Sequence, residues 1–363
     1  MNNPVGLETY GFLPAMRAAL EARGSIVEIP ARVTAVHKER YALVCEQGEC
    51  FGRLKSVVYF NGGTQEFPTT GDFVLIAYNE LGDSTITETL PRCSLFARKN
   101  PTLGEADQVV AANFDSVFIM QSLNHDLNPK RLERYLTLAW QSGAIPVVVL
   151  TKVDLVESYQ EQMNEILRVA AGVDVFAVSA KTGYGFAALA GHLKPGKTIV
   201  LLGSSGVGKS SFVNALAGET VMAVNEIRED DSKGRHTTTH RQLIRMNSGV
   251  LIIDTPGMRE LGMLDASAGL SESFADVEQY FPLCRFSDCS HEREPGCAVQ
   301  AAIAAGELPL SRFESYKKLQ RESQYAASQA DYLKLKQQRT TEIAKLSKAL
   351  QKSGGKRGPY RGD

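Results

Sequence analysis

An eight-residue segment between an apolar run and a helical pattern constrains this chain more than any other feature. Residues 203–210 read G-S-S-G-V-G-K-S and match the phosphate-binding pattern G-x-x-x-x-G-K-[ST] at every specified position. The apolar run Thr198–Leu202 predicts a strand before it, and the periodicity of the next residues predicts a helix after it. The sequence therefore predicts a P-loop nucleotide-binding domain. A glycine-rich turn ahead of a buried helix is the weaker alternative.

Each part of this loop has an expected role. The glycines let consecutive backbone N–H groups and a helix N-terminus point at a phosphate. Lys209 is expected to reach the β- and γ-phosphates, and the Ser210 hydroxyl to bind Mg²⁺. The predicted phosphate-binding residues are Gly203, Ser204, Ser205, Gly206, Val207, Gly208, Lys209 and Ser210.

Two segments upstream of the loop predict that the base is guanine. A strand pattern ends in T-K-V-D, where Asp154 can accept hydrogen bonds from N1–H and the 2-amino group of guanine, and the stem of Lys152 can lie along the base. The S-A-K segment, Ser179, Ala180 and Lys181, matches the loop whose backbone contacts guanine O6. Each motif alone is weak, but together beside a P-loop they favour GTP over ATP.

A third apolar strand pattern, Val250–Asp254, runs into D-T-P-G at residues 254–257. Asp254 is expected to hold Mg²⁺ through water, and the Gly257 N–H to touch the γ-phosphate. A hydroxyl of the threonines at 237–239, which we assign to Thr238, is expected to complete the Mg²⁺ shell when the γ-phosphate is present.

The residue after Gly257 is Met258, where many GTPases place a water-orienting glutamine. A thioether cannot orient water, so the sequence predicts slow hydrolysis that a partner accelerates. His236 is a candidate for positioning the water, and Arg235 or Arg259 for stabilising transition-state charge. Each is equally consistent with a solvated residue of a switch segment.

These motifs occur in an unusual order along the chain. The base-reading segments at 151–154 and 179–181 precede the phosphate loop, the threonines and D-T-P-G, whereas an ordinary small GTPase places them last. A sheet can still close if the usual termini are joined and new ends open elsewhere. The sequence thus predicts a circular permutation, which puts the D-T-P-G segment directly before the C-terminal part of the chain.

Three cysteines and a histidine are crowded together after this domain, in the pattern C-x₄-C-x-H-x₅-C. A Cys₃His set suits tetrahedral Zn²⁺ and leaves no position open for substrate, which predicts one structural zinc ion. Buried thiols beside an incidental histidine are the alternative. The predicted ligands are Cys284, Cys289, His291 and Cys297.

Differences in residue pattern between successive segments of the sequence predict a multidomain protein. Five short β-rich runs separated by turn residues suggest an OB-type barrel, although an SH3-like barrel or half-sandwich gives a similar pattern. The runs are Ala31–Val36, Tyr41–Cys45, Gly52–Val58, Phe73–Tyr78 and Ser84–Thr89. Alternating strands and helices then predict a parallel sheet covered on both faces. The expected strands are Ser116–Gln121, Pro146–Leu150, Val175–Val178, Thr198–Leu202 and Val250–Asp254. The expected parts are an N-terminal extension (1–30), the barrel (31–97), the GTPase domain (98–268), a zinc-binding helical domain (269–340) and a disordered basic tail (341–363).

Charge and hydropathy limit the partners. Net charge is −1, but residues 332–363 hold nine Lys/Arg and two acids, a pattern typical of polyanion-binding or solvated tails. The longest apolar run, Ala144–Leu150, is too short to cross a bilayer, and no leader pattern is visible. We therefore expect a cytoplasmic monomer without a membrane partner.

The chain resembles the ribosome small subunit-dependent GTPase A (RsgA/YjeQ) family over about residues 31–325. The resemblance rests on the order of the motifs above and on two further segments, G-R-H-T-T-T-H at 234–240 and N-P-K-R-L-E-R-Y-L at 128–136. The resemblance implies an OB-fold, a permuted GTPase domain, a zinc domain, and a late role in maturing the small ribosomal subunit, which stimulates hydrolysis. It extends nucleotide binding to Thr151 and Ser211. Many members have asparagine at position 151, so the threonine is expected to cost a contact with the phosphate loop.

The function expected is therefore a GTP/GDP switch with Mg²⁺ that binds the small subunit and its rRNA and leaves after hydrolysis. Lys38, Arg40, Phe51, Arg53 and Lys55 could give the barrel a basic, partly aromatic RNA-binding surface, or could be ordinary solvated residues. The rival hypothesis is a regulatory GTP-binding module for a protein or membrane complex, with incidental hydrolysis. A P-loop kinase or ATPase is a more distant alternative.

Overall fold

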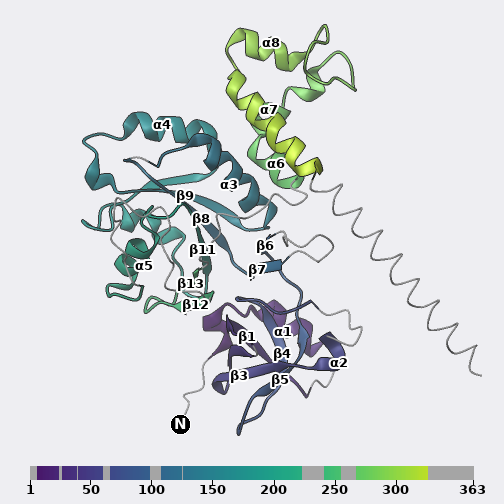
Figure 1. The fold of residues 1–363 in the computed structure, drawn as a ribbon, viewed down its shortest axis with the longest axis vertical. Coiled ribbons are helices and arrows are strands. Elements are labelled where there is room, and N and C mark those ends of the chain that lie inside the picture. The colour runs from purple at the N-terminus through teal and green to yellow at the C-terminus, as the bar shows by residue number, and fades with distance from the viewer. Residues whose placement is uncertain are drawn as a thin grey trace, which may run out of the picture.

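The computed structural model describes residues 6–23, 27–38, 40–59, 66–98, 108–124, 126–222, 241–254 and 267–325. Figure 1 shows three parts: a small β-barrel that holds the first strands, a central α/β part, and a small helical unit at the opposite end. The tail expected at 341–363 and the end of the expected helical domain lie outside the described residues. Among the described residues, no helix is long and apolar enough to cross a membrane.

The barrel has the strand order of an OB-fold. Its strands are β1 (Ile29–Val36), β2 (Tyr41–Cys45), β3 (Gly48–Leu54), β4 (Phe73–Ala77) and β5 (Ser84–Thr89). They follow the order β1-β2-β3-β5-β4, β4 pairs back with β1, and β3 runs parallel to β5. The predicted OB-type barrel is therefore confirmed, and the pairing closes the sheet edges.

One strand boundary in the barrel was predicted wrongly. The expected strand at 52–58 ends at Leu54, and a short helix, α2 (Ser56–Tyr59), follows. The reason is the burial of Tyr59, which is 5% exposed among the barrel's apolar residues and whose hydroxyl bonds that of Thr89. Packing of this ring outweighs the β-propensity of the valines before it.

Ahead of the barrel, a 3₁₀ helix η1 (Leu7–Tyr10) and α1 (Pro14–Glu21) pack onto its outside. Leu7 and Phe12 are almost completely buried and share a small core with Phe73 and other barrel residues. The expected N-terminal extension thus contributes buried apolar surface to the barrel.

The central sheet is mostly parallel. Its order is β10 (Asp174–Ala177), β9 (Ile145–Thr151), β8 (Ser116–Ser122), β11 (Thr198–Leu202), β13 (Leu251–Asp254) and β12 (Gln242–Arg245). The first five run parallel, and β12 is antiparallel to β13. The sequence predicted the five parallel strands but not β12, because its four residues follow a polar segment that resembles a switch.

Helices cover both faces of this sheet, as predicted. One core contains residues of α3 (Pro129–Gln141) and Ile166 of α4 (Gln160–Val169). The other contains Phe212 and Val213 of α5 (Lys209–Ala217) together with Leu189. The alternating sides of the sheet's side chains divide its apolar residues between these two cores.

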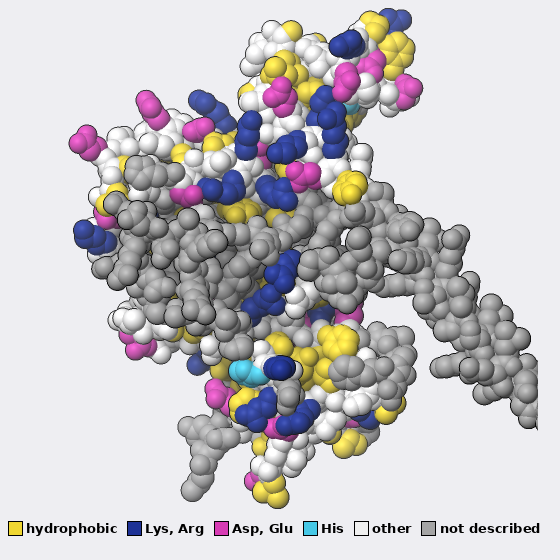
Figure 2. Space-filling view, viewed as in Figure 1, with side chains coloured by type: hydrophobic (Ala, Val, Ile, Leu, Met, Phe, Trp, Pro, Cys, Tyr) yellow, Lys and Arg dark blue, Asp and Glu magenta, His cyan; other side chains and the backbone are white. Residues whose placement is uncertain are grey.

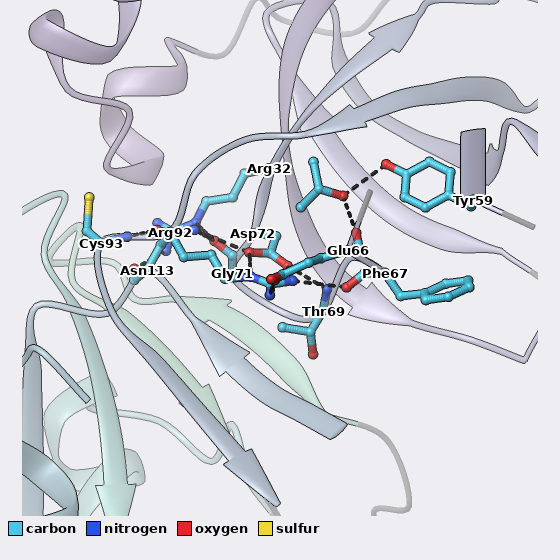
Figure 3. A network of polar contacts seen from close by, with 11 residues as sticks. Arg32, Tyr59, Glu66, Phe67, Thr69, Gly71, Asp72, Arg92, Cys93 and Asn113 are labelled. Atoms are coloured by element: carbon cyan, nitrogen blue, oxygen red, sulfur yellow. Dashed lines mark hydrogen bonds and ion pairs between the residues drawn. The ribbon is translucent and has the colours of Figure 1, made fainter. Parts of the chain in front are cut away.

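The barrel and the central sheet join through β1 and β12, which pair at Ala35 and Gln242. A second connection is the two-stranded ribbon of β6 (Leu95–Arg98) and β7 (Gln108–Ala112). Beside it lies a buried polar network (Figure 3). In that network, Arg92 donates two 2.8 Å hydrogen bonds to the fully buried carboxylate of Asp72.

Arg32 of β1 lies at the centre of this junction and is only 1% exposed. Its guanidinium donates to the backbone carbonyls of Tyr10, Gly71 and Asn113, which belong to the extension, the barrel and the loop before β8. Burial lowers the pKa of Arg32 to about 10. One cation therefore holds three segments through hydrogen bonds to neutral carbonyls, with the Phe73 ring 4.8 Å away.

The C-terminal unit packs on α3. It comprises α6 (Ser267–Ser273), α7 (Ala275–Glu278), η5 (Phe281–Leu283), α8 (Ala298–Ala305) and a helix described over 310–325. Helix α6 approaches α3 so closely that a Cβ at Gly269 would lie 2.3 Å from the carbonyl oxygen of Thr137. The chain enters this unit directly after the segment that follows β13, as the permutation predicts.

Replacing Gly71 with alanine should destabilise the junction. Gly71 has φ +95°, and an added Cβ would lie 2.1 Å from the Ala112 carbonyl oxygen. We expect a loss of at least about 2 kcal/mol in the free energy of unfolding, measured by urea denaturation. Gly172→Ala is the control, because its φ is +74° and nothing lies within 4 Å of the added Cβ. Equal losses for the two variants would contradict this account.

Candidate nucleotide site and metal centre

The predicted nucleotide-binding segments meet at one edge of the central sheet. Strand β8 pairs in parallel with β9 and with β11, so the carboxyl ends of all three strands lie together. The T-K-V-D segment begins at the last residue of β9, and the phosphate loop follows β11. Ligands of open α/β sheets bind at this edge.

The phosphate loop leads into α5, as the motif requires. Gly206 and Gly208 have φ of +74° and +104°, values that favour glycine. A Cβ at Gly203 would lie 2.7 Å from the Met120 carbonyl oxygen, so the loop can turn this close to β8 only without a side chain. Lys209 folds back over the loop and donates to the carbonyls of Gly203 and Ser204 at 2.8 and 2.7 Å.

A hydrogen bond connects the base-reading strand to the phosphate loop. Thr151, at the end of β9, donates from its hydroxyl to the Val207 carbonyl at 2.6 Å. Its side chain is buried. Threonine at this position therefore still contacts the backbone of the loop, and the expected loss of a contact relative to asparagine stays a prediction.

The two base-reading segments lie side by side. The Ser179 hydroxyl donates to Asp154 at 2.6 Å, and the Val153 N–H donates to the Val178 carbonyl. Lys152 has φ +62°, an uncommon conformation for a residue other than glycine and one often found at functional sites. Ser179 is fully buried, whereas Lys181 in the next turn is exposed. The arrangement fixes one carboxylate oxygen of Asp154 and orients the group that sequence analysis assigned to the guanine edge.

The predicted Mg²⁺ and switch residues are only partly described. Asp254 ends β13, next to β11, and Ser210 lies in the first turn of α5. His236, Thr238 and Gly257 lie outside the described residues, so their predicted roles stay predictions.

Sequence reasoning missed the loop between β8 and α3, which lies against the phosphate loop. Ser204 donates its hydroxyl to the carboxylate of Asp126. Arg131, in the first turn of α3, forms a 2.8 Å ion pair with that carboxylate, and Gln121 exchanges two hydrogen bonds with the backbone of Asn128. The segment N-P-K-R-L-E-R-Y-L contains Asn128 and Arg131 but does not indicate these roles, because the roles arise from contact with a loop about 80 positions away in the sequence.

The cysteine cluster forms a compact set of ligand atoms in the C-terminal unit. The three thiol sulfurs and a ring nitrogen of His291 all lie within 4.8 Å of one another. The Nδ1 atom of His291 is 3.4 Å from Cys284 Sγ and 3.7 Å from Cys297 Sγ. Four ligands at zinc bonding distances in a tetrahedron are separated by about 3–4 Å, so the donor set fits one Zn²⁺ ion.

Backbone N–H groups at the start of α8 donate to two sulfurs of this cluster. Cys297 caps the N-terminus of α8, where its sulfur accepts from the Gln300 N–H at 3.5 Å, and Cys284 accepts from the Ala298 N–H at 3.3 Å. Although burial raises it, the pKa of Cys284 is lowered by the hydrogen bonds from the backbone of Ala298 and Val299, because they stabilise its charged form. The His291 ring stacks on the Phe281 ring with 4.3 Å between ring centres, and the backbone carbonyl of His291 accepts from the Gln300 side chain. These contacts orient the ligands.

Comparison with known proteins identifies the family. The RsgA GTPase family model matches residues 89–264. Over 321 residues the chain is 47% identical to "Small ribosomal subunit biogenesis GTPase RsgA 1" of Listeria monocytogenes, covering 88% of this chain and 90% of that protein. This chain belongs to the RsgA family. It is also 41% identical to RsgA of Methanosarcina acetivorans, over 80% of this chain and 79% of that protein.

Solved RsgA-type structures agree with the fold. YjeQ from Thermotoga maritima matches with a TM-score of 0.61 and 28% identity, covering 82% of this chain and 98% of the other. YloQ, described as a circularly permuted GTPase, matches with a TM-score of 0.59 over 82% of this chain and 95% of the other; at 24% identity it shows the fold alone. The prediction of a permuted GTPase is confirmed.

Membership in this family makes the chain a GTPase with GTP, GDP and Mg²⁺ as its ligands. An ABC transporter family model also matches residues 186–353. That range includes the phosphate loop, which ATPases and GTPases share, but neither the T-K-V-D segment nor S-A-K.

The metal centre can be tested by metal analysis of the purified chain. We expect about one zinc ion per chain, and Cys289→Ala should lose the metal and lower the thermal stability of the protein. Chelation should have the same effect, because a structural ion contributes directly to folding. Cys93→Ser, an exposed cysteine outside the cluster, should keep the zinc. Full zinc occupancy in Cys289→Ala would exclude this ligand set.

Proposed function

We propose that this GTPase acts in the biogenesis of the small ribosomal subunit as a late maturation factor. The observation that carries the proposal is the agreement with relatives named for this activity, which extends over about nine-tenths of both chains. The GTP-bound form binds the subunit, the subunit stimulates hydrolysis, and the GDP-bound form leaves. We infer that the protein acts as a monomer in the cytoplasm.

The nucleotide site we propose extends from the phosphate loop to Asp154. The hydrogen bond between Thr151 and Val207 supports it, because it holds the base-reading strand against the loop. Ser210 and Thr238 bind Mg²⁺, Asp254 assists through water, and His236 positions the attacking water. The remaining nucleotide contacts come from Lys152, Ser179, Ala180, Lys181, Ser205, Ser211 and Gly257.

The barrel supplies part of the proposed rRNA surface. The Arg40 guanidinium lies 3.7 Å from the centre of the Phe51 ring, which is 38% exposed. Arg40 and Arg53 both pair with Asp83, at 3.7 and 2.6 Å. Figure 2 shows Lys and Arg side chains gathered with a histidine on this barrel, and a second group where the C-terminal unit meets the α/β part. Cations beside exposed aromatic rings suit phosphates and unstacked bases.

The permutation supports a mechanical role for hydrolysis. The D-T-P-G segment joins β13 to α6, so a change at the γ-phosphate acts on the chain that leads to the metal centre. Met258 follows Gly257 in place of a water-orienting glutamine, which supports a need for stimulation by the subunit.

Asp154→Asn tests whether the carboxylate of Asp154 recognises guanine. An amide in place of the carboxylate puts donors opposite the donors of guanine, so we expect GTP affinity to fall about 100-fold or more. Xanthosine triphosphate, which has a carbonyl at position 2, should bind the variant better than GTP does. Asp174→Asn, at an exposed carboxylate that pairs with His192, is the control and should bind GTP normally. Unchanged preference for GTP in Asp154→Asn would remove Asp154 from the site.

The function itself is tested by the GTPase rate with and without purified small subunits. We expect stimulation of about tenfold or more, and GTP-dependent co-sedimentation that ends when GTP is hydrolysed. Large subunits at the same concentration are the control. A rate that small subunits do not change would overturn the proposal and favour a regulatory module with incidental hydrolysis.

A further inference from the structure

The first turn of helix α3 connects to the phosphate loop through Asp126, which lies in the loop before the helix. Asn128 caps the helix by accepting from the Arg131 N–H at 3.0 Å. Arg131 pairs with Asp126, and Asp126 accepts from the Ser204 hydroxyl of the phosphate loop. The position of the loop therefore depends on a short chain of contacts that starts on α3.

The residues two and three positions after Arg131 on the same helix contact the C-terminal unit. Glu133 forms a 2.8 Å ion pair with Arg312, and both side chains are about 5% exposed. Arg312 also pairs with Asp276 at 3.0 Å. Arg134 pairs with Glu322 at 2.5 Å, nearer the surface. Residues 131 and 133 are separated by only about 3 Å along the helix axis, so the two sets of contacts share one rigid turn.

Polar groups at this interface are incompletely satisfied. Among the described residues, three buried side-chain atoms have no hydrogen-bond partner within the protein: Arg131 Nε, Glu133 Oε2 and Ser273 Oγ. Two lie on α3, and the third lies on α6, whose Ser273 carbonyl accepts from Arg312. Unsatisfied buried groups raise the free energy of the packed arrangement, which lowers the cost of separating the C-terminal unit from α3.

We propose that α3 couples the packing of the C-terminal unit, which holds the cysteine cluster, to the conformation of the phosphate loop. In this role Asp126 is a positioning residue for Ser204, and the Glu133–Arg312 pair sets where α3 lies. Release of the C-terminal unit, for example on contact with a partner, shifts α3 and loosens the loop around the nucleotide. This route is separate from the D-T-P-G connection, and it rests on the proposed nucleotide site at residues 203–210.

A double-mutant cycle on the full-length protein tests the coupling. Arg312→Lys keeps the charge but loses the forked contacts, and Ser204→Ala removes the hydrogen bond to Asp126 without changing charge. Binding of a fluorescent GDP analogue is the readout. We expect each variant to weaken binding about fivefold and the double variant to weaken it no more than either one, because both break the same route.

Lys317→Gln is the matched control, since Lys317 pairs with Glu292 inside the C-terminal unit and should leave binding within about twofold of wild type. If Arg312→Lys fails to fold or loses its metal, Arg134→Gln replaces it, because Arg134 pairs with Glu322 at the exposed edge of the same interface. We expect this variant also to bind the GDP analogue about fivefold more weakly. The coupling would be overturned if the losses in GDP-analogue binding multiplied in the double variant, or if Arg312→Lys and Arg134→Gln bound the analogue normally. Wild-type protein that does not bind GDP would instead refute the nucleotide site.

Discussion

The parallel pairing of β8 with β9 on one side and β11 on the other is the constraint on which the rest of the structure depends. It brings the ends of two strands, which the chain visits about 50 residues apart, to one edge of the sheet. There, Thr151 bonds the phosphate loop and Ser179 holds Asp154. A base-reading carboxylate and an anion-binding loop can thus form one pocket although their order in the sequence is reversed.

The units around this pocket are attached through buried charge. Arg32 joins the barrel to the α/β part through backbone carbonyls. Arg312, which also pairs with Asp276 inside the C-terminal unit, joins that unit to α3 through the carboxylate of Glu133. Both attachments are strongly directional, since a buried cation that loses its acceptors is costly. The barrel and the C-terminal unit are therefore held in defined positions, which suits the proposed contact of both with the small subunit.

The sequence predicted features whose cause is local. Glycines at 203, 206 and 208 are needed where the backbone turns, and the cysteine cluster is close in sequence because its loop is short. Contacts between distant segments could not be predicted. The bond between Asp126 and Ser204 and the pair of Glu133 with Arg312 join residues 78 and 179 positions apart, and the motifs that contain Ser204 and Glu133 do not indicate these partners. Tyr59 shows the same limit, because tertiary packing made a helix where its neighbours favour a strand.

The proposed nucleotide site unites these segments in a single guanine-nucleotide pocket. Calorimetric titration of the purified chain with GDP and with ADP tests whether that pocket exists. We expect one GDP per chain and binding of ADP at least about 100-fold weaker, because adenine offers no matching donors to Asp154. Equal affinity for the two nucleotides, or no binding of GDP, would contradict it.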